Sequence, residues 1–111
     1  MKIWWQDEDS DIGWYSLMLD ESELAYMCYI PIKYRNCTER ERKIFKGGLY
    51  EVGYCLDGCS SNWVLNAKTL EEAKKEVQDY FVEYYKNRIK AAKNRIKHCE
   101  NVLNALIGEM K

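Results

Sequence analysis

A seven-residue repeat of apolar side chains near the C-terminus constrains this chain more than any other feature. Residues 86–106 read KNRIKAA, KNRIKHC and ENVLNAL, so the same residue classes return in three successive heptads. A period of 3.5 residues is typical of a helix that buries one narrow seam against another helix. The repeat therefore predicts assembly, and we expect a homo-oligomer, a dimer or larger. The predicted seam consists of Val82, Tyr85, Ile89, Ala92, Ile96, Cys99, Leu103, Leu106 and Met110.

The helix that carries the seam is predicted to begin at a capping box at Thr69 and to end at Gly108 in a left-handed cap. No glycine or proline interrupts Leu70–Ile107, which would be ~57 Å long as one straight helix. Such a helix can run unbroken and pair with a second copy, or it can break near Asn87 or His98 into an antiparallel hairpin. Neither residue supplies a turn, so the continuous helix is favoured.

The first half of this helix has a different apolar stripe, at Leu70, Ala73, Val77, Phe81 and Tyr85. Its steps are mostly of four residues, which turns the stripe around the helix relative to the later heptads. We expect the first three turns to cover a sheet and the remainder to meet a partner.

The first 67 residues carry strand signals separated by turn residues. Alternation at Tyr26, Cys28, Ile30, Ile32 and Tyr34 predicts a strand with that face buried. Pro31 within it indicates an edge strand or a bulge. Residues 35–43 are expected to form a polar connection that can include one helical turn. Asp57-Gly58 begins a hairpin loop longer than two residues. The fold class is thus α+β: an antiparallel sheet of four or five strands in residues 1–67, and a helical oligomerisation region in 68–111, in one folded domain. The expected strands are 3–5, cut off by the acidic cluster, 14–19, 26–34, 50–56 and 62–66.

Cysteine usage and hydropathy predict a cytoplasmic protein with no membrane span. The five cysteines are an odd number, and the N-terminus lacks the apolar core of a signal peptide. Cys55 and Cys59 with His98 and Cys99 offer an alternative as a four-ligand zinc site. Only one pair has local spacing, so buried thiols are favoured and no metal is expected.

Charge is segregated along the chain although the net charge is only −1. Residues 1–27 hold seven acidic groups against Lys2. An acidic, aromatic N-terminal region of this kind can bind a partner protein or form part of the core. The candidate partner-binding residues are Trp4, Trp5, Asp7, Glu8, Asp9, Asp11 and Trp14.

Six basic residues and no acid lie between Tyr84 and Cys99. Asn87, Asn94 and Asn101 repeat on the outer face beside the arginines, although asparagine is a poor helix former. Guanidinium and amide groups suit phosphates and nucleobase edges. This basic face is interpreted either as a solvated surface or as a ligand surface. Its candidate ligand-binding residues are Arg88, Arg95, Asn87, Asn94 and Lys93.

Catalysis has no support in the sequence. His98 is the only histidine and has no serine or carboxylate at a motif spacing, and no phosphate-binding or metalloprotease motif occurs. We expect a protein that is not an enzyme and uses no cofactor.

In layout, with an aromatic-rich sheet followed by a capped long helix, the chain resembles small phage-encoded anti-defence proteins. Sponges of the anti-Thoeris kind are similar in pairing a sheet with C-terminal helices that oligomerise. The resemblance implies sequestration of a nucleotide immune signal near the oligomer interface. An anti-CRISPR-type inhibitor that binds an effector through the acidic region is the alternative, and a structural or adaptor role is the third. Direct nucleic-acid binding is not expected at pI 5.9.

Overall fold

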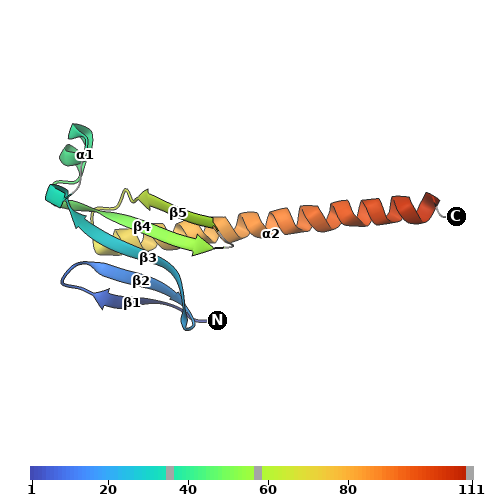
Figure 1. Cartoon of the computed structure of the whole chain (residues 1–111), viewed down its shortest axis with the longest axis horizontal. Helices are drawn as coiled ribbons and strands as arrows, with labels where there is room; N and C mark the ends of the chain where they lie inside the picture. Colours follow the sequence, from blue (N-terminus) through green and yellow to red (C-terminus); the bar gives the residue numbers. More distant parts are fainter. Residues whose placement is uncertain (35–36, 57–58, 110–111) are drawn as a thin grey trace. The chain divides into compact units, whose positions relative to one another are not determined.

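The computed structural model describes residues 1–34, 37–56 and 59–109, and it shows an α+β protein (Figure 1). Five strands form one antiparallel sheet in the order β1-β2-β3-β4-β5, so each strand pairs with the next along the chain. Two short helical segments separate β3 from β4, and one long helix follows the sheet. The elements are β1 (Ile3–Asp9), β2 (Trp14–Leu19), β3 (Ser22–Pro31), η1 (Ile32–Tyr34), α1 (Glu39–Ile44), β4 (Gly48–Leu56), β5 (Cys59–Val64) and α2 (Leu70–Glu109).

The core of the sheet lies on the face that carries Leu17, Met27 and Val52, each at most 1% exposed. The registers Met27↔Val52 and Leu17↔Ala25 place these side chains on one side. The predicted buried face of β3 is therefore wrong: Tyr26 is 39% exposed, and the residues that alternate with it form the core. Both faces of β3 are rich in apolar or aromatic side chains, so the period of two did not identify the buried one.

Three predictions about the strands also need correction. Pro31 lies neither on an edge strand nor at a bulge but at the end of β3, the central strand, opposite Gly48. The β1 strand continues through the acidic cluster, because Asp7 pairs with Tyr15 on β2. The β4–β5 hairpin is tighter than predicted, since Leu56 at the end of β4 pairs with Cys59 at the start of β5. The two residues between them, Asp57 and Gly58, lie outside the described residues.

The connection between β3 and β4 contains the predicted helical turn as α1. Its N-cap is Thr38, whose side-chain oxygen accepts a hydrogen bond from the Glu41 backbone N–H at 3.2 Å, and the Glu41 carboxylate accepts from the Thr38 N–H at the same distance. This capping box fixes where α1 begins. Residues 35–36 of the predicted connection lie outside the described residues.

Side chains from the first turns of α2 fix how this helix starts. The Glu72 backbone N–H donates to Thr69 Oγ1 at 3.2 Å, as the predicted cap requires, but the Glu72 carboxylate accepts from the Lys68 N–H instead of the Thr69 N–H. The Glu76 carboxylate accepts backbone N–H groups of Asn66 and Ala67 at 3.0–3.1 Å. Carboxylates that accept these N–H groups satisfy backbone donors where the chain enters the helix.

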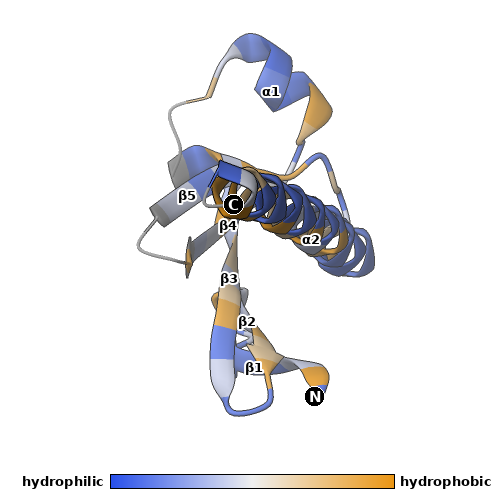
Figure 2. Ribbon diagram, turned by 90° about the vertical axis from the view of Figure 1, so that its right-hand side faces the viewer, coloured by the Kyte–Doolittle hydropathy of each residue, from blue (hydrophilic) through white to orange (hydrophobic). Residues whose placement is uncertain are grey.

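The first turns of α2 lie beside the core face of the sheet (Figures 1 and 2). Ala73 and Val77 are fully buried there. Lys74 extends its ammonium group over two rings of the same face, 5.5 Å from the Tyr15 centroid and 5.8 Å from that of Trp5. The expectation that the start of the helix covers a sheet is confirmed.

The α2 helix is continuous over 40 residues, so the hairpin alternative is wrong. It passes through Gly108, whose φ is not positive, and ends at Glu109, so the predicted left-handed cap is also wrong. The chain divides into two compact units, Met1–Val77 and Gln78–Lys111.

Candidate functional site

The heptad seam of α2 is exposed along its whole described length. Ile89 is 56% exposed, Ile96 58% and Leu106 57%, and the remaining seam residues Val82, Tyr85, Ala92, Cys99 and Leu103 are exposed as well. Figure 2 shows α2 as a mostly hydrophilic ribbon in which hydrophobic residues recur along the helix. Met110, the last predicted seam position, lies outside the described residues.

Burial along α2 changes sharply at one place. The early stripe is buried at Ala73, Val77 and Phe81, which are at most 4% exposed, whereas Val82 is 50% exposed. The change coincides with the point at which the apolar spacing changes from four residues to alternating threes and fours. An aligned row of aliphatic side chains left in water is typical of an interaction surface.

Two predicted ligand-binding residues border a hollow on α2. Arg88 and Arg95 lie seven residues apart and line a depression of about 410 Å³. Its floor is formed by the small side chains of Ala91 and Ala92 with Ile96 beside them. The absence of bulk at two successive alanines creates the hollow between the guanidinium groups.

Arg88 is partly ordered by a neighbour one turn away. Its guanidinium carbon lies 5.7 Å from the Tyr84 ring centroid, and its Nη1 donates to the Tyr84 hydroxyl at 3.4 Å. A tyrosine stack of this kind holds the guanidinium without neutralising its charge.

The other three predicted ligand-binding residues lie on other faces of the helix. Asn87 and Asn94 occupy the outward heptad position, and Lys93 flanks the seam on the side away from the arginines. All three are exposed, and none lines the hollow. The structure thus brings Arg88 and Arg95 together and leaves the asparagines apart from them.

The acidic N-terminal residues lie on an edge strand. Asp7, Glu8 and Asp9 are exposed on β1, and Asp11 follows in the turn, where its backbone N–H donates to Asp9 Oδ1 at 3.1 Å. The carboxylates therefore form an exposed acidic edge, which we define as residues 7–11.

The three N-terminal tryptophans do not form one cluster. Trp5 is under Lys74 on the core face, whereas Trp4 and Trp14 lie on the opposite face. The Trp4 indole N–H donates to the Asp20 carbonyl oxygen at 2.8 Å, so Trp4 is held in place. Trp14 is 42% exposed and remains the tryptophan most available to a partner.

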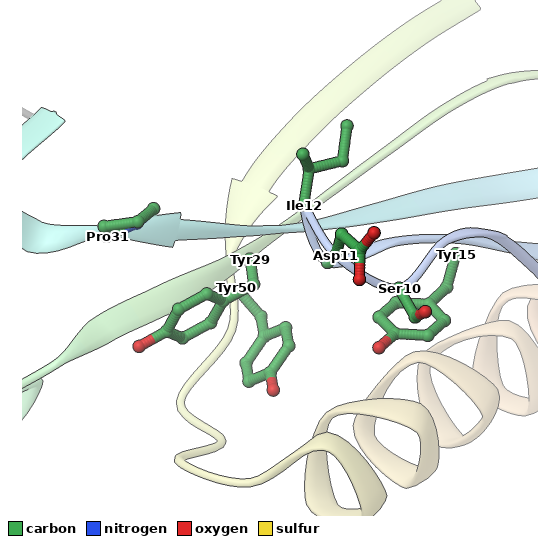
Figure 3. A pocket seen from close by; sticks show the side chains of 8 residues that line it. Ser10, Asp11, Ile12, Tyr15, Tyr29, Pro31 and Tyr50 are labelled. Atoms are coloured by element: carbon green, nitrogen blue, oxygen red, sulfur yellow. The ribbon is translucent and has the colours of Figure 1, made fainter.

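A tyrosine-lined hollow on the core face was not found by the sequence reasoning. Tyr15, Tyr29 and Tyr50 line a cavity of about 600 Å³. Figure 3 shows these rings, with Ser10 and Asp11 from the β1–β2 turn near Tyr15. The Tyr29 and Tyr50 rings are 5.1 Å apart and inclined by 57°. Burial, and then the neighbouring Tyr15 and Tyr29, raise the pKa of Tyr50 above its ordinary value.

One glycine permits this arrangement. Gly13 has φ +70°, and a Cβ added there would lie 2.6 Å from Tyr29 Cβ. Its carbonyl oxygen accepts the Tyr29 backbone N–H at 2.8 Å, which ties the turn to β3. The sequence contains a signal for this hollow, because Ala25, Met27 and Tyr29 alternate along the face of β3 opposite the one predicted to be buried.

Among the described residues, no group of three or more histidine, cysteine or acidic side chains is placed to hold a metal ion. His98 and Cys99 are exposed on α2, and the side chains of Cys55 and Cys59 lie outside the part of the chain that is described. The alternative of a zinc site formed by these four residues is therefore not tested.

In the described residues, no helix is long and apolar enough to cross a membrane. The sequence matches no protein-family model, and comparisons with curated proteins and with solved structures found no significant match.

Proposed function

We propose that this protein is a non-catalytic, homo-oligomeric binding protein that assembles through α2 and captures a nucleotide-type ligand at or near the interface. The exposed seam from Val82 to Leu106 carries the proposal. In the single chain, its aliphatic side chains expose about half of their surface to water, and burying that surface favours association. Because the side chains recur with the heptad spacing of a coiled coil, the seam of a second copy can pack against them.

The arginine hollow supports the ligand class. Arg88 and Arg95 present two guanidinium forks on either side of Ala91 and Ala92. Guanidinium groups bind phosphate oxygens in pairs, and the alanine floor leaves room for a sugar or base. The hollow also includes Ala92 and Ile96 of the seam, so its position favours a site at the edge of an oligomer interface.

The biological role that fits this arrangement is sequestration of a nucleotide immune signal by a phage or mobile-element protein in the host cytoplasm. The support is the resemblance in layout to anti-defence sponges, with a sheet followed by a long helix that we propose to oligomerise. The role follows from binding alone and requires no catalytic group.

Two measurements test the proposal. Light scattering should give a mass at least twice that of the 13.2 kDa chain. Calorimetry against linear and cyclic nucleotides should detect binding that Arg88→Ala and Arg95→Ala abolish, whereas Lys90→Ala, an equal loss of charge on the same helix, retains it. A monomer at all concentrations, or binding that is equally lost in the Lys90 variant, would contradict the proposal.

The acidic edge favours a second candidate function, inhibition of a nucleic-acid-guided effector. Its exposed carboxylates can imitate DNA phosphates and occupy a basic channel. A variant with Asp7→Asn, Glu8→Gln and Asp9→Asn should then lose binding to purified effector complexes and no longer compete with target DNA. If the native protein binds none of them, this candidate fails.

A further inference from the structure

We propose that two copies of α2 pair antiparallel about a twofold axis at the level of Asn94, and that this pairing completes a site for a multivalent phosphate anion between four arginines. The inference rests on the proposed homo-oligomer and adds its orientation, its register and the charge of its ligand.

The side-chain volumes along the seam decide the orientation. In an antiparallel register centred on Asn94, Ala92 faces the partner's Ile96 and Cys99 faces the partner's Ile89. Each small side chain then meets a large one, so the layers have similar volumes. In a parallel pair each residue meets its own copy, which places two alanines between layers of paired isoleucines and two cysteines between a layer of isoleucines and a layer of leucines. Uneven layers of that kind leave voids, which close packing disfavours.

The outer layers and the length of the helix fit the same register. Val82 faces the partner's Leu106, and Tyr85 faces the partner's Leu103. The helical residues 79–109 are then paired with the same residues of the partner over their full length. The whole exposed seam is covered, and the pairing needs no residue from the unit Met1–Val77.

The charged flanks do not by themselves select an orientation. A parallel pair gains Arg95 beside the partner's Glu100 but places Arg88 beside the partner's Lys93. The antiparallel pair gains Lys86 beside the partner's Glu100 in two symmetric copies, and it places Lys93 beside the partner's Lys93. Because Lys86 faces Glu100 only in the antiparallel register, these two residues report on the orientation.

On the arginine flank of the antiparallel pair, the heptad positions between Phe81 and Glu109 are Arg88, Arg95 and Val102, so the two copies bring like charges together. Arg95 meets the partner's Arg95 at the axis, and one Arg88 lies about 9 Å along the helix to each side. Ala92 packs against the partner's Ile96, but the outer sides of the two hollows, floored by Ala91, adjoin there, so four guanidinium groups are spread over about 18 Å. Like charges gathered at an interface are relieved by a bound anion, and guanidinium forks select phosphate. A spread of this length suits an anion with several phosphate groups.

A charge exchange tests the register. At low salt, Lys86→Glu should weaken dimerisation about tenfold, because two attractive pairs become repulsive. Glu100→Lys should weaken it similarly, and the double variant should restore the native dissociation constant in sedimentation equilibrium. In a parallel dimer the double variant would stay as weak as Glu100→Lys alone, and that result would overturn the register.

Tripolyphosphate tests the anion site. At constant ionic strength it should tighten the native dimer, and calorimetry should give one anion per dimer. Arg95→Gln should dimerise more tightly than the native chain without the anion and should lose the response. Lys90→Gln removes an equal charge at an exposed position outside the hollow, so it should keep the response. One anion per chain, or the same response in Arg95→Gln as in the native protein, would refute the site.

The proposed homo-oligomer and the antiparallel register can be refuted separately. A monomer in light scattering would contradict both the proposed function and this inference. A dimer in which the charge exchange gives no rescue would contradict only the antiparallel register and its shared anion site.

Discussion

Replacing Ile96 with alanine should weaken self-association without destabilising the single chain. The side chain is 58% exposed in that chain, so little of its surface depends on intramolecular packing. At an exposed helical position alanine is the better helix former by a few tenths of a kcal/mol. The free energy of unfolding of the isolated chain should therefore stay the same or rise slightly.

The cost to the oligomer can be worked out from the exposed fraction. The three carbons removed carry ~2.4 kcal/mol of hydrophobic transfer free energy when fully buried. Because 58% of the side chain is still exposed in the single chain, pairing can bury about that fraction of it. The hydrophobic free energy of association lost in the variant is then roughly 1.4 kcal/mol per chain, or about 2.8 kcal/mol per dimer. The dimer dissociation constant should rise about 100-fold.

The assay combines sedimentation equilibrium with denaturant unfolding at several protein concentrations. Val77→Ala is the matched control, because Val77 is fully buried within one chain. It should lower stability by about 1–2 kcal/mol at every concentration without a direct effect on association. If Ile96→Ala leaves the association constant unchanged, or lowers stability as Val77→Ala does, the reasoning about the seam is refuted.

Three further predictions concern the unit Met1–Val77. Gly13→Ala should lower the free energy of unfolding by about 2–3 kcal/mol, measured by thermal unfolding, because φ is +70° and the new methyl group meets a neighbouring strand. Gly108→Ala has open space around it and should not lower stability. Equal effects of the two substitutions would contradict this reasoning. Glu76→Gln should lower the free energy of unfolding by about 1.5–3 kcal/mol, because it weakens charge-assisted hydrogen bonds from the backbone N–H groups of Asn66 and Ala67. An unchanged melting temperature would count against this prediction. The raised pKa of Tyr50 should make stability fall as the pH rises above 10.0, the ordinary tyrosine pKa, because the unfolded chain loses the Tyr50 proton before the folded chain does. Tyr50→Phe should reduce this loss of stability at high pH. An identical dependence of stability on pH in the two proteins would argue against the prediction.

Local sequence patterns were sufficient for the fold class. The cap at Thr69 and the strand Trp14–Leu19 were predicted at their observed positions. The change of apolar spacing, predicted between Phe81 and Tyr85, also falls where burial ends along α2, although Tyr85, the last residue of the early stripe, is 41% exposed. Each of these depends on side-chain period or on backbone groups a few residues away, which the sequence contains directly.

The candidate sites were only partly accessible from sequence. The seven-residue spacing of Arg88 and Arg95 places them on one face of any helix, and the structure shows them around one hollow. The asparagines share the same period but point elsewhere, so periodicity alone did not separate ligand-facing from outward positions. The tyrosine hollow needed three strands in register, which no local pattern contains.

The sequence by itself determined that this chain forms a sheet and a long helix with an unsatisfied apolar seam. The tertiary structure decided which face of β3 is buried, that the helix runs unbroken, and where cavities form. The physical reason is that Tyr26 and Met27 differ little in local preference for a strand. Only the neighbouring strands and the covering helix decide that Met27 is fully buried while Tyr26 remains exposed to water.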